Sequence, residues 1–343
     1  MTQSTKWHLA FTIACCAALA SCAADDYSVK PKPAGHQIHY HMASKAEGQQ
    51  ELLSNDKYYS GMKQQDIEWR MRKTGATIDE LKAYAQEQVL DFSEEQKTVI
   101  SRSITDIEER LKSMKIRLPF PDDITYIHTT QLEEGGSAAY THKTAIYLSE
   151  RVLSLGLPLD APKNPTQCLE VMAHELFHCL TRNNAEFRQT MYSLIGFTIL
   201  DQELELKGEN QEMMMANPDV ERIDNYAEFT INGEKRKCEL IVLYSRKWAD
   251  AAAATDDPSK LSFFKNFRQV LVPLDALDTN YDINDVPDFW DKVGRNTDYV
   301  FAPEECMADN FADAIVHGLT GKEYKTPQLI QNIISTLQQK YPL

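Results

Sequence analysis

The chain has 343 residues, a length that fits one large domain or two modest ones. Hydrophobic residues make up 43% of it and aromatic residues 9%, which is ordinary for a packed globular protein. The formal net charge is −15, with a pI near 5.1. This acidity argues against nucleic acid or an anionic membrane surface as a main partner.

The N-terminus has the features of a bacterial secretory signal. Lys6 precedes an apolar run, 7–20, that is too short to span a bilayer as a helix, which needs about 20 apolar residues. The run ends in Leu-Ala-Ser-Cys at 19–22, which resembles the bacterial lipobox, where cleavage precedes a lipidated cysteine. We therefore predict a lipoprotein signal peptide over 1–21 and a lipid anchor on Cys22. The protein would then be extracytoplasmic, anchored to a bacterial membrane on its periplasmic or surface side; the alternative is a plain cleaved signal.

Residues 22–44 are rich in proline and charge and show no hydrophobic period, so they are predicted to link the anchor to a domain over 45–343. From about 46 to 117 the apolar residues recur at helical spacing. Thr77 and Ser93 are candidate N-caps within this region, and Pro119 ends it. Two strands are predicted next, over 124–130 and 138–148, because both runs are rich in β-branched and aromatic residues.

A helix from Pro165 to about Arg182 is predicted from its apolar face and from Asn164, a good N-cap. It contains His-Glu-x-x-His at 174–178. Residues four apart differ by about 40° around a helix, so the two imidazoles point the same way and can hold one divalent metal. The glutamate lies about 100° from the first histidine, within reach of a water on that metal. The motif alone also fits a buried helix with two satisfied histidines.

The next hundred residues give weaker signals. Apolar spacing predicts a helix from 185 to 206, and Asn-Pro-Asp at 217–219 predicts a turn. Alternation over 226–248 indicates a small β insertion. Asp-rich helical and loop segments are predicted from there to 297.

A second helix carries the acidic residues that complete the pattern. Pro303 stands where this helix should begin. Glu305 and Asp309 are four apart and therefore share a face, while alanines at 308 and 312 allow close approach to another helix. Glu304 is the alternative metal ligand, but it has no carboxylate partner four residues on.

His174-Glu175-x-x-His178 followed by Glu305-x-x-x-Asp309 resembles the gluzincin, or thermolysin-like, zinc metallopeptidases. The resemblance implies an α+β, mostly helical, zincin-like metalloprotease domain with a small mixed β-sheet and an active-site helix. It implies one Zn²⁺ per chain, held by His174, His178 and Glu305, with Asp309 orienting His174. Glu175 would be the general base in hydrolysis of a peptide or protein substrate.

Two further expectations come with the resemblance. The strand near 139–148 would be the edge strand that pairs with an extended peptide. A tyrosine or histidine would stabilise the oxyanion, and Tyr299 is the first choice ahead of Tyr226, Tyr140 and His142. The 127 positions between His178 and Glu305 exceed the spacing of the simplest gluzincins, so residues from about 207 to 297 are predicted to be an insertion.

Two other functions stay open at this stage. One is a non-catalytic metal-binding lipoprotein, although a structural site would not need Glu175 as a base. The other is a zinc hydrolase of a non-peptide substrate, such as a cell-wall cross-link. The disulfide state is also open: outside the cytosol, the remaining cysteines permit three pairings or none. They are Cys168, Cys179, Cys238 and Cys306.

Overall fold

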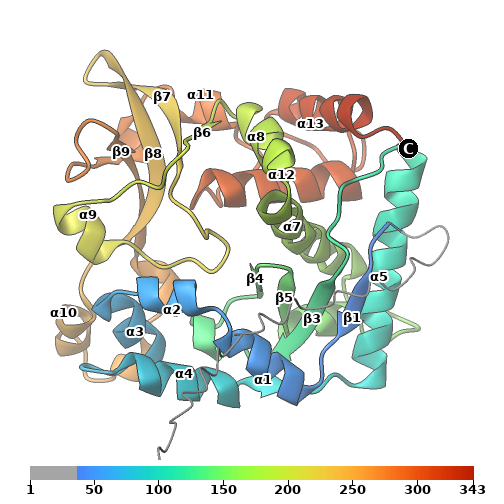
Figure 1. The fold of residues 1–343 in the computed structure, drawn as a ribbon, viewed down its shortest axis with the longest axis horizontal. Helices are drawn as coiled ribbons and strands as arrows, with labels where there is room; N and C mark the ends of the chain where they lie inside the picture. Colours follow the sequence, from blue (N-terminus) through green and yellow to red (C-terminus); the bar gives the residue numbers. More distant parts are fainter. Residues whose placement is uncertain (1–36) are drawn as a thin grey trace, which may run out of the picture. The chain divides into compact units, whose positions relative to one another are not determined.

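The computed structural model describes residues 37–343. The predicted signal peptide, Cys22 and the linker as far as residue 36 lie outside the described residues. The described chain is α+β, with many helices and two five-stranded sheets. In Figure 1 the first sheet lies beside helix α5, and the second sheet occupies the opposite side of the ribbon.

The first sheet is mixed, with the strand order β1-β3-β5-β4. β1, β3 and β5 are parallel, β2 pairs antiparallel with β3, and β4 lies at an edge, antiparallel to β5. The strands are β1 (Tyr40–Met42), β2 (Val89–Leu90), β3 (Ile124–Thr129), β4 (Ala139–His142) and β5 (Ala145–Ser149).

Two predictions for this sheet need correction. The single strand predicted over 138–148 is a hairpin, whose turn contains Lys143 with φ of 52°. The turn lacks Gly and Pro, so the apolar pattern runs through it without a visible break. The linker predicted to end at residue 44 also ends earlier, because Ile38 is buried and β1 pairs with β3. Three strand residues are too few to show an alternating pattern.

The helical prediction for 46–117 is confirmed, apart from the short strand β2. Thr77 and Ser93 cap their helices as predicted, each accepting a hydrogen bond from the third helical N–H in a capping box. The helices are α1 (Lys45–Leu53), α2 (Asp56–Gly61), α3 (Gln64–Met71), α4 (Ile78–Glu87) and α5 (Glu94–Ser113).

Helices α7 (Pro165–Asn183) and α12 (Pro303–Val316) pack against each other at the centre of Figure 1. Both begin with the predicted proline, and Asn164 caps α7 by accepting from the N–H of Gln167. Phe177 and Phe311 meet between them, with ring centroids 5.3 Å apart. Three further helices complete this part: α6 (Glu150–Leu153), α8 (Ala185–Ser193) and α13 (Pro327–Lys340).

The helix predicted over 185–206 is too long. Helix α8 ends at Ser193, Gly196 turns the chain with φ of 79°, and strand β6 follows at Thr198–Ile199. Ile195 lies beyond the helix but is fully buried. This apolar residue continues the helical spacing of α8 in the sequence, so the predicted helix is too long.

The second sheet is antiparallel, in the order β10-β9-β8-β7-β6. The predicted β insertion at 226–248 is confirmed by β7 (Asn225–Ile231) and β8 (Glu234–Tyr244). The sheet is larger than predicted, since β9 (Phe267–Pro273) lies in a segment predicted to be helix and loop. Its other elements are β10 (Tyr281–Asp282), α9 (Gly208–Met213), α10 (Trp248–Ala253) and α11 (Phe289–Val293).

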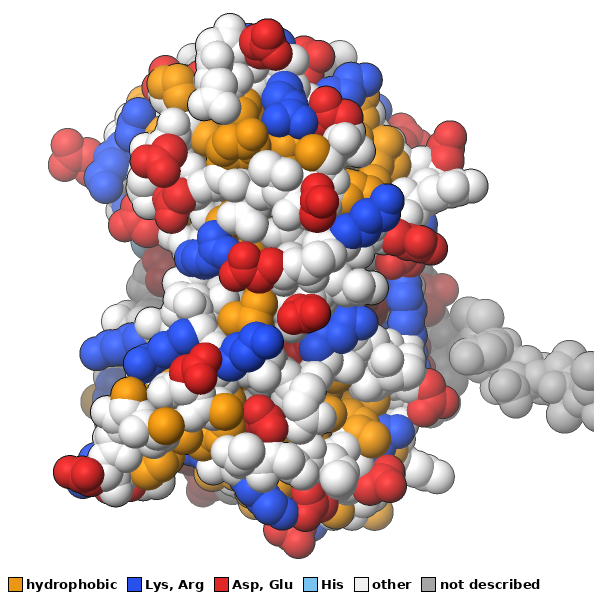
Figure 2. Space-filling model, turned by 90° about the vertical axis from the view of Figure 1, so that its left-hand side faces the viewer, with side chains coloured by type: hydrophobic (Ala, Val, Ile, Leu, Met, Phe, Trp, Pro, Cys, Tyr) orange, Lys and Arg blue, Asp and Glu red, His pale blue; other side chains and the backbone are white. Residues whose placement is uncertain are grey.

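Short 3₁₀ helices connect these elements. They are η1 (Leu132–Glu134), η2 (Ser154–Gly156), η3 (Pro258–Lys260), η4 (Phe263–Asn266) and η5 (Ile283–Asp285). On the face shown in Figure 2, Lys and Arg side chains are interspersed with Asp and Glu, so the chain's negative charge is not gathered there into one acidic surface.

Two further findings concern the cysteines and the helices. Cys168, Cys179, Cys238 and Cys306 are all buried and free, so the described cysteines form no disulfide and pack as small apolar residues. Among the described helices, none is both long and apolar enough to cross a membrane.

Candidate metal centre

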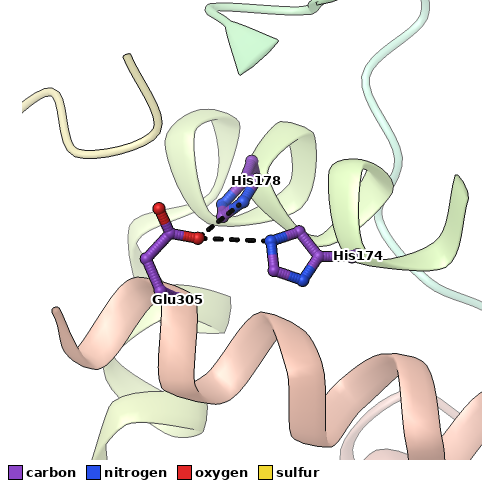
Figure 3. Close-up of side chains that lie close together, drawn as sticks. All are labelled: His174, His178 and Glu305. Atoms are coloured by element: carbon purple, nitrogen blue, oxygen red, sulfur yellow. Dashed lines mark hydrogen bonds and ion pairs between the residues drawn. The ribbon is translucent and has the colours of Figure 1, made fainter. Parts of the chain in front are cut away.

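Helices α7 and α12 bring the three predicted metal ligands together (Figure 3). Glu305 Oε2 lies 3.2 Å from His174 Nε2 and 3.6 Å from His178 Nε2. The three donor atoms all lie within 4.8 Å of one another. The side chains of His178 and Glu305 are fully buried, whereas 13% of the His174 side chain is exposed.

The other ring nitrogen of each histidine contacts a carboxylate. His174 Nδ1 is 2.8 Å from Asp309 Oδ1, the contact that the resemblance to the gluzincins implied. His178 Nδ1 is 2.8 Å from Glu304 Oε1. A proton held at each Nδ1 leaves each Nε2 with its lone pair toward Glu305. A carboxylate bonded to Nδ1 also orients the imidazole ring and raises the basicity of its other nitrogen.

The sequence does not predict the contact of Glu304 with His178 and offers Glu304 only as an alternative metal ligand. Its neighbour Glu305 is about 100° away on the helix, so the two carboxylates approach His178 from different sides. Thr181 and Tyr192 donate hydroxyl hydrogen bonds to Glu304 and hold it in place. The only sequence signal for this arrangement is the pair of adjacent glutamates after Pro303.

The donor geometry fits a zinc ion. His178 Nε2 is buried and has no hydrogen-bond partner among the described residues. Tetrahedral ligands at about 2.0–2.1 Å from zinc lie about 3.3 Å from one another, and the distances from Glu305 to the two histidines, 3.2 and 3.6 Å, are close to this value. Two imidazole nitrogens and a carboxylate oxygen form a ligand set that catalytic zinc uses.

Glu175 is buried beside these ligands, at the edge of the first sheet. Its Oε2 accepts a 2.7 Å hydrogen bond from Thr141 Oγ1 on strand β4. This bond joins α7 to the edge strand and fixes one oxygen of the carboxylate. The predicted base therefore lies between the histidine helix and the strand predicted to bind an extended chain.

A segment of the insertion also reaches the site. We call residues 216–222, between α9 and β7, the strap. Asn217 Nδ2 donates a 2.6 Å hydrogen bond to Glu305 Oε1. Asp219 Oδ1 accepts from the backbone N–H of Thr141 at 2.7 Å and lies 3.8 Å from His178 Nε2. The sequence predicted a turn at 217–219 but gave no signal for where in the fold this turn lies.

Several carboxylates of the site are buried close to one another. Burial and the charges of Glu175 and Glu305 raise the pKa of Asp219 well above its ordinary value. Burial would also raise the pKa of Glu304, but the hydrogen bond and charge of His178 lower it below its ordinary value. A divalent cation between the histidines would compensate the charge that these carboxylates share.

Of the four candidates for oxyanion stabilisation, Tyr299 alone lines the cleft that contains His174 and Glu175. Its hydroxyl donates to Glu305 Oε1 at 3.4 Å. The others lie elsewhere: Tyr140 donates to Glu133, His142 packs on Tyr58, and Tyr226 lies on β7 under Lys237.

The cleft has a volume of about 590 Å³. It is lined by the histidine helix, the strap and the edge-strand region, including His174, Glu175, Asp219 and Ala139. A nearby group of Glu170, Asp313 and His317 is less suited to a metal. There His317 Nε2 already contacts Glu170 at 2.6 Å, and Lys322 pairs with Asp313 at 2.7 Å.

Comparisons of the chain with protein-family models, with curated proteins and with solved structures found no match. What the fold and the site define is an α+β protein with a candidate metal centre between two packed helices.

Proposed function

We propose that this protein is a zinc-dependent peptidase with a zincin-like domain of the gluzincin type. The observation that carries the proposal is that three suitable zinc ligands and a buried glutamate lie together beside a sheet edge, with His174 and Glu175 lining the adjoining cleft. His174, His178 and Glu305 would hold one Zn²⁺ per chain. A purely structural metal site would need neither Glu175 nor an adjoining edge strand.

Zinc held there supplies Lewis acidity, which polarises a carbonyl oxygen and makes water more acidic. Glu175 accepts a proton from the attacking water and passes it to the leaving amine. We assign this proton to Glu175 Oε1, because Oε2 already accepts from Thr141. Asp309 and Glu304 hold the Nδ1 protons of the histidines. The hydroxyl of Tyr299, which donates to Glu305 Oε1, would donate to the oxygen that becomes negative.

Strand β4 supplies the means of aligning a peptide. The backbone N–H groups of Thr141 on β4 and of Lys143 in the turn that follows both point away from β5, since each donates to a side chain outside the sheet. An extended substrate that accepted from these groups would run along the edge strand past Glu175. The substrate class that fits the cleft is therefore an extended peptide or a flexible protein segment.

The test is Glu175→Gln, with Glu186→Gln on the exposed face of α8 as a matched control. We expect the first variant to keep about one zinc per chain and to cleave an unfolded protein substrate about 10²–10⁴-fold more slowly. The control should match the wild type in both respects. A wild-type protein that holds no zinc would refute the proposal. Zinc without peptide cleavage in the wild type would favour a metal-binding lipoprotein or a hydrolase of another substrate.

The proposal includes a location: a bacterial lipoprotein, extracytoplasmic and anchored to a membrane through a lipid on Cys22. This rests on the sequence at 19–22, outside the described residues. Cys22→Ser should move the protein from the membrane fraction to the soluble fraction, because the anchor is lost. Fractionation that does not change would contradict the anchor without affecting the zinc site.

A further inference from the structure

The strap lies along β4 where an added strand would lie. Asp219 Oδ1 accepts from the N–H of Thr141 at 2.7 Å, and Glu221 Oε1 accepts from the N–H of Lys143 at 2.9 Å. The donors are Thr141 on β4 and Lys143 in the turn that follows, two residues apart, and the two acceptors are likewise two residues apart in the strap. Successive carboxylates of the strap thus occupy the hydrogen-bonding positions that an extended peptide would use.

Asp219 also reaches the metal ligands. Its Oδ1 lies 3.8 Å from His178 Nε2, nearly the 3.6 Å that separates this nitrogen from Glu305 Oε2. Together with Glu175 and His178 it forms a second group whose donor atoms lie within 4.8 Å of one another. A catalytic zinc keeps one coordination position for water or substrate. Asp219 approaches that position from the side of His178, although the group formed by His174, His178 and Glu305 does not include it.

The strap is held mainly by polar contacts. Ala216 donates its N–H to Asp66 at 2.8 Å and accepts at its carbonyl from Arg70 at 2.6 Å. Arg182 donates to the carbonyl of Pro218 at 3.0 Å. In Figure 1 the chain between α9 and β7 extends from the second sheet toward α7.

On another side, the strap borders a cavity of about 440 Å³. Strap residues Pro218 and Val220 line it together with Met215, Ile241 and Phe301. Polar contacts can be exchanged for those of a competing chain, and the cavity offers the strap space to move.

We propose that Asp219 is a displaceable fourth ligand of the metal and that the strap holds the place of the substrate strand. The fold described is then a latent form of the peptidase proposed above, and the inference rests on that proposed metal site. Activation exchanges ligands without breaking a covalent bond: the Asp219 carboxylate leaves, and water or a substrate carbonyl takes its position. The N–H groups of Thr141 and Lys143 then pass from the strap to the substrate backbone.

The experiment uses the full protein loaded with Co²⁺, whose visible absorption reports the number and type of ligands. Asp219→Asn keeps an acceptor for Thr141 but removes the anionic ligand, and Asp219→Ala removes both. Glu205→Gln, in the exposed chain before α9, is the matched control. Each protein is titrated with acetohydroxamate, a small metal-binding probe that must compete with Asp219.

We expect the cobalt spectrum of both Asp219 variants to differ from that of the wild type. Both variants should also bind acetohydroxamate at least about tenfold more tightly, because no internal ligand must be displaced first. Glu205→Gln should match the wild type. Identical spectra and affinities for wild type and both Asp219 variants would overturn this inference and leave the zinc proposal standing. Weaker acetohydroxamate binding in the variants would also overturn it. A wild type that binds no cobalt would overturn both proposals.

Discussion

Two buried clusters of carboxylates contact the strap, and they are neutralised differently. We call the first the arginine cluster: Arg70 contacts Glu134 at 2.7 Å and Asp66 at 3.4 Å, with Tyr58 and Tyr244 also bonded to its guanidinium. We call the second the histidine cluster; it surrounds His174 and His178. Its carboxylates are Glu175, Asp219, Glu304, Glu305 and Asp309.

The comparison shows how burial of charge separates a structural cluster from a reactive one. The guanidinium of Arg70 is always charged, so the arginine cluster carries its own cation. In the histidine cluster the buried His178 Nε2 has no hydrogen-bond partner among the described residues, and the pKa of Asp219 is raised by burial and neighbouring charge. We therefore expect the arginine cluster to govern folding and the histidine cluster to govern metal affinity.

The largest expected effect is on the arginine cluster. Arg70→Met leaves Glu134 and Asp66 buried without their cation, which should cost about 3–5 kcal/mol of unfolding free energy. Urea unfolding of the metal-free protein measures it. Arg72→Met, at an exposed position two residues on, should change the stability by no more than about 0.5 kcal/mol. Equal effects of the two variants would show that the arginine cluster is not structural.

The next effect concerns Glu133, beside the arginine cluster. Burial raises its pKa from 4.5 to about 7, and its Oε2 has no hydrogen-bond partner among the described residues. The folded protein therefore keeps a proton that the unfolded chain releases, and stability is lost as the pH rises from about 4.5 through 7. This loss amounts to about 3 kcal/mol.

Glu133→Gln removes that ionisation. Its unfolding free energy should fall less than that of the wild type between pH 5 and pH 8, as measured by urea unfolding at both values. Glu87→Gln, exposed on α4, should follow the wild type. A pH dependence in Glu133→Gln as steep as that of the wild type would assign the proton to another group.

A smaller effect is expected from the outer contacts of the histidine cluster. Asp309→Asn removes the carboxylate that orients His174 and should weaken zinc binding about 10–100-fold. Competition with a chromogenic chelator measures this. The stability of the metal-free protein should change little in comparison with Arg70→Met. Asp313→Asn, one turn further along α12, is the control whose zinc affinity should stay that of the wild type.

The sequence predicted those site residues whose spacing lies within one helix. His174 and His178 on α7, and Glu305 and Asp309 on α12, are each four apart, so their shared faces follow from helix geometry. The contact between Glu304 and His178 depends on how α12 crosses α7, which no local pattern records. The same is true of Asp219: a turn was predicted there, but its contact with Thr141 depends on how the second sheet lies beside the first.

The errors in secondary structure have a similar origin. The turn at Lys143 and Thr144 has no glycine or proline, and β9 lies among Asp-rich segments that resemble loops. In both places the tertiary structure determines the conformation against a weak local preference. The helices that start with a capping side chain or a proline, by contrast, begin where the sequence placed them.

The position of α12 in the chain has a consequence for biosynthesis. A ribosome makes His174 and His178 long before Glu305, since 127 positions separate His178 from Glu305. An emerging chain that ends before residue 303 carries the histidine pair but lacks the carboxylates of α12 that hold both rings. The complete centre can therefore form only after the chain has been synthesised beyond Asp309.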